Sequence, residues 1–199
     1  MSASLLGRAA LATLTALVAV VALAPAARAA CPAVPLSQPF KPWYDLAEYT
    51  LVPEGSFEGS TNGWALSEAR VVFGNEPFYV NSSRDVRSLE ISAGGSATSP
   101  AVCTTALEPV LRFFARSSGS GELRIDAVFE GRLSGEFHYV QVGLIPPMPV
   151  WGPTPQVAVV ANLRPALPDE ELPVAFRLTP LDGSSWQVDD VYLDPYLRS

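Results

Sequence analysis

The residues able to do acid–base or nucleophilic chemistry are few in this sequence. His138 is the only histidine among the 199 residues, so a serine or cysteine triad would need it as the base. No Gly-x-Ser-x-Gly segment is present to place a serine nucleophile for such a triad. We therefore expect His138 to lie on the face of a strand beside Tyr139, outside any catalytic site.

A pair of carboxylates, as in glycoside hydrolases, is the other catalytic possibility. Glu122, Asp126 and Glu130 recur every four residues within one predicted strand, which places them on one face. At about 3.3 Å per residue, neighbours in this set would be about 13 Å apart, too far for an acid and a nucleophile. The sequence therefore favours a protein that is not an enzyme.

Aromatic residues offer a different chemistry, because exposed rings can stack on sugars. Trp151 lies in the proline-rich segment PPMPVWGPTP, which is stiff enough to hold a ring outward at low entropic cost. Tyr139 and Tyr79 are further aromatic residues that the alternation of apolar and polar residues does not assign to the core. We predict that these three residues contact a ligand. The alternative for Trp151 is that it folds back and caps one end of the fold.

The elements that must position these residues are short strands. In 122–130 apolar residues alternate with polar ones, and the same period of two recurs in 173–179. Further strands are expected at 69–73, 78–80, 88–92, 110–116, 137–145, 156–163 and 186–193. Gly-, Ser- and Asn-rich turns separate them, and beyond the N-terminal segment only 46–50 could form a helical turn. The pattern predicts an all-β protein with antiparallel sheets, as a sandwich or a barrel.

Two segments carry a family resemblance. Near the start of the predicted domain stands EGSFEGSTNGW (54–64), and near its end stands SWQVDDVYL (185–193). Together they resemble the opening and closing motifs of carbohydrate-binding modules with the galactose-binding-like jelly-roll fold, which pairs its first and last strands. The resemblance implies an antiparallel β-sandwich. The residues themselves agree, since Phe57 and Trp64 would be core anchors on either side of a Gly-rich turn. It also implies a carbohydrate ligand.

The same resemblance implies a structural calcium ion. In that family the acidic residue of the opening motif and an aspartate of the closing strand often help to hold it. These positions correspond to Glu58 and to Asp189 or Asp190. Calcium takes about six to eight oxygen ligands from carboxylates and carbonyls, which three such side chains could partly supply. The alternative is a solvated pair, or one aspartate bonded to an arginine or to backbone amides.

The first thirty residues have the pattern of an export signal. Arg8 precedes the apolar run AALATLTALVAVVALA, and Ala27-Arg28-Ala29 fits a cleavage site after Pro25. The run is shorter than the roughly 20 residues that span a bilayer. We therefore predict a secreted protein with no stable membrane insertion after cleavage; an uncleaved anchor and a lipid on Cys31 are the alternatives. The predicted organisation is a signal peptide at 1–29, a proline-rich lead-in at 30–48 and a β-sandwich domain at 49–199.

The charge limits the classes of partner that we expect, and the cysteine content indicates one disulfide. Cleavage after residue 29 would leave 11 basic and 20 acidic side chains, a net charge of −9. This charge argues against nucleic acids and anionic membrane surfaces as partners. Cys31 and Cys103 are the only cysteines, and in an exported protein they are most simply one disulfide, with two free thiols as the alternative.

Two functions stay open at this point. A secreted, non-catalytic binding domain for polysaccharide or a cell-envelope glycan should present exposed aromatic rings along a groove or a loop end. A structural or adhesive envelope protein should instead present an apolar patch for protein partners and no groove. We favour the first, although a fold by itself does not specify a function.

Overall fold

The computed structural model describes residues 33–105, 109–130, 135–159 and 171–194. This part of the chain forms eleven strands and one short 3₁₀ helix, η1 (Lys41–Trp43). The strands are β1 (Thr50–Leu51), β2 (Ala65–Phe73), β3 (Arg87–Thr98), β4 (Val102–Thr105), β5 (Val110–Ser118), β6 (Leu123–Glu130), β7 (Phe137–Ile145), β8 (Gly152–Pro153), β9 (Val157–Ala158), β10 (Glu171–Pro180) and β11 (Ser185–Asp194). Within these ranges, no helix has the length and apolar character needed to span a membrane.

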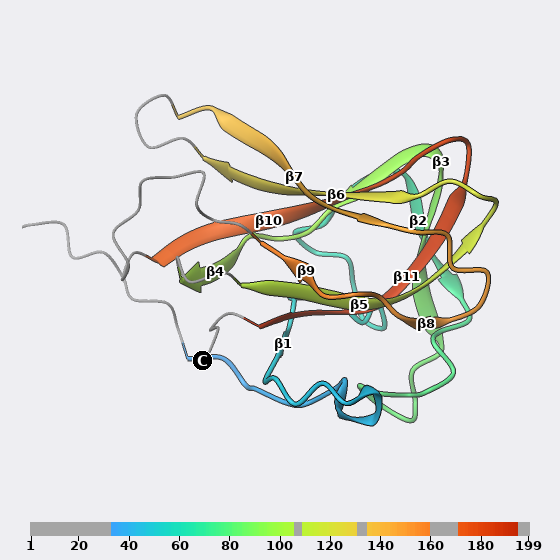
Figure 1. Cartoon of the computed structure of the whole chain (residues 1–199), viewed down its shortest axis with the longest axis horizontal. Helices are drawn as coiled ribbons and strands as arrows, with labels where there is room; N and C mark the ends of the chain where they lie inside the picture. The colour runs from blue at the N-terminus through green and yellow to red at the C-terminus, as the bar shows by residue number, and fades with distance from the viewer. Residues whose placement is uncertain (1–32, 106–108, 131–134, 160–170, 195–199) are drawn as a thin grey trace, which may run out of the picture.

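The strands form a two-layered antiparallel sandwich (Figure 1). Their hydrogen-bonded order is β7-β6-β10-β3-β11-β5-β8. The C-terminal half of β3 pairs with β10 and its N-terminal half with β11, so β3 belongs to both layers. We name the β7, β6, β10 side the upper sheet and the β11, β5, β8 side the lower sheet. The predicted all-β, antiparallel sandwich is confirmed.

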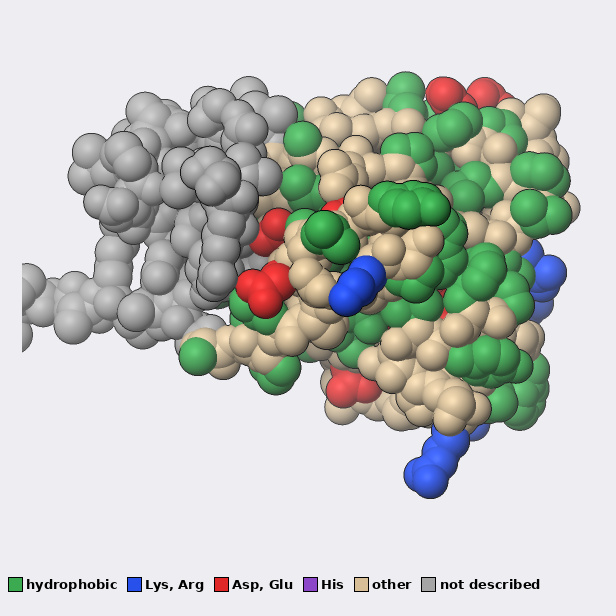
Figure 2. Space-filling view, turned by 60° about the horizontal axis from the view of Figure 1, so that its bottom comes forward, with side chains coloured by type: hydrophobic (Ala, Val, Ile, Leu, Met, Phe, Trp, Pro, Cys, Tyr) green, Lys and Arg blue, Asp and Glu red, His purple; other side chains and the backbone are tan. Residues whose placement is uncertain are grey.

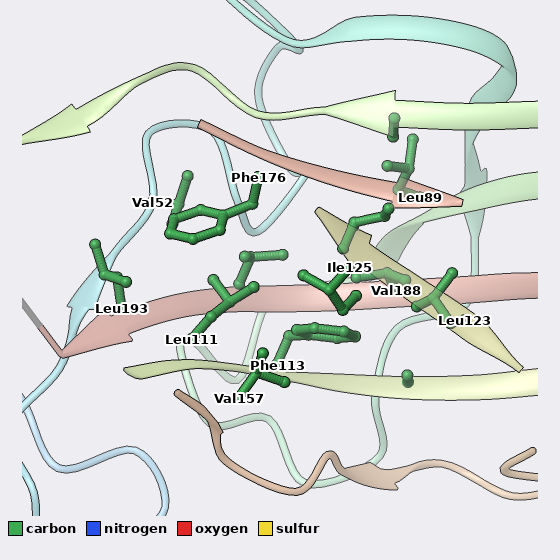
Figure 3. Close-up of a cluster of buried hydrophobic side chains, with 14 of the residues drawn as sticks. Val52, Leu89, Leu111, Phe113, Leu123, Ile125, Val157, Phe176, Val188 and Leu193 are labelled. Atoms are coloured by element: carbon green, nitrogen blue, oxygen red, sulfur yellow. The ribbon is translucent and has the colours of Figure 1, made fainter. Parts of the chain in front are cut away.

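A hydrophobic core fills the space between the two sheets (Figure 3). Its fully buried members include Leu89, Leu111, Phe113, Leu123, Ile125, Phe176 and Val188. Burial of one such side chain stabilises the fold by roughly 1.5–3 kcal/mol. Phe57 and Trp64 of the opening segment are buried as predicted, with their rings edge-on at 5.0 Å. β1 pairs with β11, so the first and last strands are neighbours, as the resemblance implied.

The hairpin of β2 and β3 bends so that it can join both sheets. The pairing register shifts between Ser67 and Ala69, and Glu68 has a φ of 47° at the bend. A Cβ added to Gly95 would come within 2.7 Å of the carbonyl oxygens of Ser67 and Glu68. Glycine is therefore required for the close approach of the two strands at this bulge.

The described part of the lead-in packs on the outer face of the lower sheet. A second buried cluster forms there from Phe40, Tyr49, Val110, Phe114 and Tyr192. Beside it, the Asp45 carboxylate accepts hydrogen bonds from Arg112 and from the Tyr49 hydroxyl. Figure 2 looks towards the side of the molecule on which the lead-in lies and shows many hydrophobic side chains at its surface. The lead-in thus contributes to folding stability as well as linking the domain to the N-terminal residues.

Two of the predicted strands differ from the structure in detail, and the helical turn that 46–50 could have formed is not present. Residues 78–80 form no strand, because Glu76 accepts hydrogen bonds from the backbone amides of Phe78 and Val80 and so curls the chain into a loop. Of the strand predicted at 156–163, the structure shows only β9, and 160–163 lie outside the described residues. Instead of that turn, η1 forms earlier in the chain, with a proline in its first turn.

The N-terminal predictions lie outside the described residues. The signal peptide at 1–29 and Cys31 are among them, so the cleavage site, the domain boundaries and the Cys31–Cys103 disulfide stay predictions. Cys103 itself is half-buried on β4.

Candidate functional site

The outer face of the upper sheet carries a line of polar side chains across four strands. Strand pairing places Asp126 of β6 between Gln141 of β7 and Arg177 of β10. Arg177 in turn lies beside Thr98 of β3. Residues paired across antiparallel strands point to the same side of a sheet, so these four side chains share one face. We name the part of this face on β6, β7 and β10 the upper face; it is formed by Arg124, Asp126, Tyr139, Gln141, Arg177 and Thr179.

Hydrogen bonding on the upper face is incomplete. The Arg177 Nη2 atom donates to the Ser96 hydroxyl at 3.1 Å. Arg177 Nε and Thr179 Oγ1, in contrast, are buried and have no hydrogen-bond partner in this structure. A buried polar atom without a partner costs about 1–3 kcal/mol, and such atoms in a native protein call for an explanation. These two atoms lie beneath the surface of the upper face, so they mark an unsatisfied spot in the packing there.

Tyr139 adds an aromatic surface to this face. Its side chain is 57% exposed on β7, and the Arg177 guanidinium lies 5.7 Å from the ring centroid. A cation–π contact of this kind stabilises both groups by about 0.5–1 kcal/mol at an exposed site. Tyr139 thus provides a phenol ring that lies against Arg177, next to the polar side chains of the upper face.

The acids considered as catalytic candidates differ in burial. Asp126 lies on the outer, polar face of β6, where it pairs with Gln141 and Arg177, yet it is only 6% exposed. Arg124 Nε donates to Asp126 Oδ2 at 3.0 Å and compensates its charge. Glu122 precedes β6, and Glu130 is its last residue. His138 is exposed and stacks on Phe129 at 5.7 Å, on a strand face as predicted.

Trp151 lies on the opposite side of the sandwich from Tyr139. Its ring is half-buried against the Phe40 cluster, with the Arg116 guanidinium 5.4 Å from the ring centroid. Trp151 therefore folds partly back onto the lower sheet, which is close to the alternative considered from the sequence. Arg116 also lines a groove of about 310 Å³ on that sheet.

Tyr79 is half-exposed in the loop between β2 and β3, with a φ of 53°. This loop covers the outer face of the lower sheet, since Val80 packs against the cluster of Phe40 and Glu76 contacts β11. The core separates Tyr139 from both Tyr79 and Trp151. The structure does not bring the three predicted rings into one site.

The same loop buries acidic side chains against the closing strand. The Glu76 amide donates to Asp189 Oδ2 at 3.1 Å, and the Asn81 amide donates to Asp190 Oδ2 at 3.2 Å. Glu76, Asp189 and Asp190 are each 1% exposed. The strand pairing shifts register between Asp189 and Tyr192, and Asp190 has a φ of 47°. This bulge is the reason that two consecutive aspartates are both buried in place of alternating between faces.

Burial shifts the ionisation of these two aspartates. The pKa of Asp189 is raised to about 9, first by burial and then by the charge of Asp190. The pKa of Asp190 is raised to about 7, first by burial and then by the charges of Glu76 and Asp85. The cluster is thus a region where a positive charge would be favourable.

The predicted calcium ligands fit this region only in part. Glu58 Oε1 accepts hydrogen bonds from the amides of Val86 and Arg87, each at 2.6 Å. Among the described residues, no group of three or more His, Cys, Asp and Glu side chains is arranged to hold a metal ion. Asp190 Oδ1, however, is buried without a hydrogen-bond partner, and a carboxylate oxygen is a ligand that calcium prefers. The donor chemistry fits a cation at Asp190, and calcium binding stays a prediction.

Sequence reasoning missed most of the upper face. Arg177 and Thr179 stand in a strand with simple alternation, where they read as ordinary solvent-facing residues. Their alignment with Asp126 and Tyr139 follows from the pairing of β10 with β6 and β7, which no local pattern specifies. The sequence held only a weak signal for this face. Polar and aromatic residues occupy alternate positions of several strands, but the sequence does not show that these strands are neighbours.

Solved structures with a similar fold include two that contain carbohydrate-binding modules. The N-terminal endo-1,4-beta-D-xylanase 10B of Clostridium thermocellum, solved as CBM22-1 and GH10 modules with xylohexaose, matches with a TM-score of 0.51. The match has 13% identity and covers 70% of this chain and 27% of that one, so the chain spans about a quarter of that protein. The CBM22-2 xylan-binding domain of Paenibacillus barcinonensis Xyn10C matches with a TM-score of 0.51 at 15% identity, over 71% of this chain and 98% of that one.

At this level of identity the matches show the fold alone, a β-sandwich similar to that of these carbohydrate-binding modules. The resemblance of the opening and closing segments is thereby confirmed for the fold. No protein-family model matches the sequence, and the search of curated proteins found no match.

Proposed function

We propose that this protein is a secreted, non-catalytic carbohydrate-binding domain and that the upper face binds a polysaccharide. The observation that carries the proposal is the exposed Tyr139 ring, which lies 5.7 Å from the Arg177 guanidinium within a row of polar side chains. An aromatic ring next to polar side chains matches a sugar, which has an apolar ring face and hydroxyl groups around it. Two structural neighbours described with xylan or xylohexaose make xylan the first polymer to test.

The upper face suits binding better than catalysis. Its one buried carboxylate, Asp126, is held in an ion pair with Arg124. Hydrolysis of a glycosidic bond needs two carboxyl groups about 5–9.5 Å apart across the scissile bond. The six residues of the upper face include a single carboxylate, that of Asp126, and it is already paired with Arg124. We therefore assign Asp126 the role of fixing the Arg124 side chain on the face.

Calcium is a second part of the proposal. A cation coordinated by Asp190 Oδ1 would compensate the charge of the acidic cluster of Glu76, Asp189 and Asp190. It would also tie the loop between β2 and β3 to β11. The ion would then stabilise the fold without touching the upper face.

The test is retention of the mature protein on insoluble xylan, other insoluble polysaccharides and purified cell walls. Tyr139→Ala and Arg177→Met should each weaken retention at least about tenfold, equal to about 1.4 kcal/mol of binding free energy. Tyr44→Ala is the matched control, because Tyr44 is 97% exposed on η1's C-terminal side, away from the upper face. Tyr139→Phe should retain most of the binding, because it keeps the ring.

Retention that survives both upper-face variants would contradict the assignment of this face. Failure of the wild-type protein to bind any of the polymers would contradict the carbohydrate-binding function itself. It would favour the structural or adhesive role with a protein partner.

A further inference from the structure

A groove crosses the outer face of the lower sheet, on the opposite side of the sandwich from the upper face. It has a volume of about 310 Å³ and lies over β3, β5 and β11. Its lining includes Glu90, Arg116, Ser117, Pro149 and Gln187. Sites for small ligands usually measure about 300–1,000 Å³, so this groove is large enough for a short piece of a polymer.

A row of polar side chains across four strands runs through the groove and continues beyond it to Arg70, which lies outside the groove's lining. Pairing aligns Arg70 of β2 with Glu90 of β3, Glu90 with Gln187 of β11, and Gln187 with Arg116 of β5. Three strand spacings of about 4.8 Å make this row about 14 Å long. A row of this length can contact an extended oligosaccharide.

One end of the row carries an uncompensated positive charge. Arg70 and Glu90 neutralise each other through an ion pair of 2.8 Å. Arg116 Nε donates instead to the neutral side-chain oxygen of Gln187. Within the described parts of the chain, Arg116 has no ion pair, and its side chain is exposed. Its remaining guanidinium donors match the geometry of a carboxylate.

Arg116 is held in place by a rigid loop. The ring of Trp151 lies 5.4 Å from its guanidinium and supports the planar group from one side. The segment leading to Trp151 is bonded to β5 twice, from Met148 N to Ser117 Oγ at 2.9 Å and from Ser117 N to Met148 O at 2.6 Å. A fixed arginine loses less conformational entropy when it binds an anion than a mobile one does.

We propose that this groove binds a uronic acid unit of a polysaccharide, with Arg116 as the ligand of the sugar carboxylate and Trp151 as a positioning residue. The Arg70–Glu90 pair and Gln187 supply donors and acceptors for hydroxyl groups of the neighbouring sugars. This site goes beyond the proposed function, since it lies on another face and takes a charged sugar. It shares with that function only the assumption that the protein binds glycans.

The test is a calorimetric titration of the mature protein with trigalacturonate and with the same trisaccharide after reduction of its carboxylates to alcohols. The wild-type protein should bind the charged form at least about tenfold more tightly, and added salt should reduce the preference because it screens the pair. Arg116→Gln should remove the preference. Arg177→Met, on the other face, should leave it intact.

The outcomes separate this inference from the proposed function. Equal affinity for the two trisaccharides would overturn the groove assignment, as would a preference that persists in Arg116→Gln. A preference lost in Arg177→Met would also overturn it, because the charged sugar would then bind the upper face. Trp151 packs against the cluster of Phe40, so Trp151→Ala would also affect folding stability. Arg116 is exposed, and Arg116→Gln is therefore the variant that tests the site. Retention on neutral xylan tests the upper face independently of all these results.

Discussion

The guanidinium of Arg177 lies 5.7 Å from the centroid of the Tyr139 ring, although β6 separates the strands that carry them. The contact crosses above β6, where Val128 pairs with Tyr139 and Asp126 pairs with Arg177. It combines a stacking surface and a hydrogen-bond donor in one place. The proposed sugar site on the upper face depends on this combination, because a sugar presents both an apolar ring face and hydroxyl groups.

Arg177 should matter more for binding than for stability. Its Nε atom is buried without a partner, so Arg177→Met removes an unsatisfied donor together with the hydrogen bond to Ser96. We expect the free energy of unfolding to change by less than about 1 kcal/mol, whereas retention on polysaccharide falls at least about tenfold. Urea unfolding and the retention assay measure the two effects. Arg84→Met, at an exposed loop position, is the control, and a large loss of stability in Arg177→Met would show that Arg177 acts as a structural residue.

The lead-in should be anchored by the buried pair of Asp45 and Arg112. Their side chains are 8% and 12% exposed, and Tyr49 and Gln156 also donate to Asp45. Removal of one partner of a buried ion pair typically costs about 3–5 kcal/mol, so we expect Asp45→Asn to lower the free energy of unfolding by about 3 kcal/mol near neutral pH. Tyr49→Phe keeps the charges and should cost only about 1 kcal/mol.

The stabilisation from Asp45 should disappear in acid. Burial alone would raise the pKa of Asp45, but hydrogen bonds from Gln156, Tyr49, the Ala47 amide and Arg112 outweigh it, so the pKa is lowered. A lowered carboxyl pKa gives stability that is complete above the unfolded value of about 3.9 and is lost as the pH falls through the folded value. The difference in unfolding free energy between wild type and Asp45→Asn should therefore shrink below about pH 4. A difference that stays constant across this range would disprove the role of the Asp45 charge.

Calcium should stabilise the wild-type protein through Asp190. An ion that binds only the folded state at about 100 times its Kd adds about 2.7 kcal/mol, which should raise Tm by about 5–10 °C. EDTA should reverse this rise, and Asp190→Asn should remove it because the unpartnered Oδ1 atom is then no longer anionic. Asp182→Asn, in an exposed turn, is the matched control. An unchanged wild-type Tm with excess calcium would exclude this site.

Gly95 should be indispensable for the bent hairpin of β2 and β3. In Gly95→Ala the new Cβ would lie 2.7 Å from two carbonyl oxygens, so the backbone must shift at a cost of about 1–3 kcal/mol. Gly59→Ala is the comparison, because its Cβ would meet only the Glu54 carboxylate at 3.6 Å and its φ is ordinary. Urea unfolding of the two variants tests the claim, and equal stabilities would show that the bulge can relax.

The fold was predictable from the sequence to a large extent, because the alternation of apolar and polar residues indicates which side of a strand is buried. Leu123, Ile125 and Ala127 alternate with polar residues and enter the core as expected. The loop at 78–80 was misread as a strand, because its apolar residues resemble a strand while the Glu76 carboxylate redirects their amides. That interaction depends on a side-chain conformation, which periodicity does not encode.

The sequence by itself determined the layers of this protein: its alternating strands, its turns and the two terminal motifs that pair as first and last strands. It also contains the aromatic and charged residues from which the proposed binding surface is made. Only the tertiary structure decided which of them meet. Tyr139 lies next to Arg177 and away from Trp151, and Asp189 and Asp190 are both buried because of a bulge. The physical reason is that strand register and strand order are set by the packing of the whole core. A site whose residues come from three strands therefore forms only when these strands have paired.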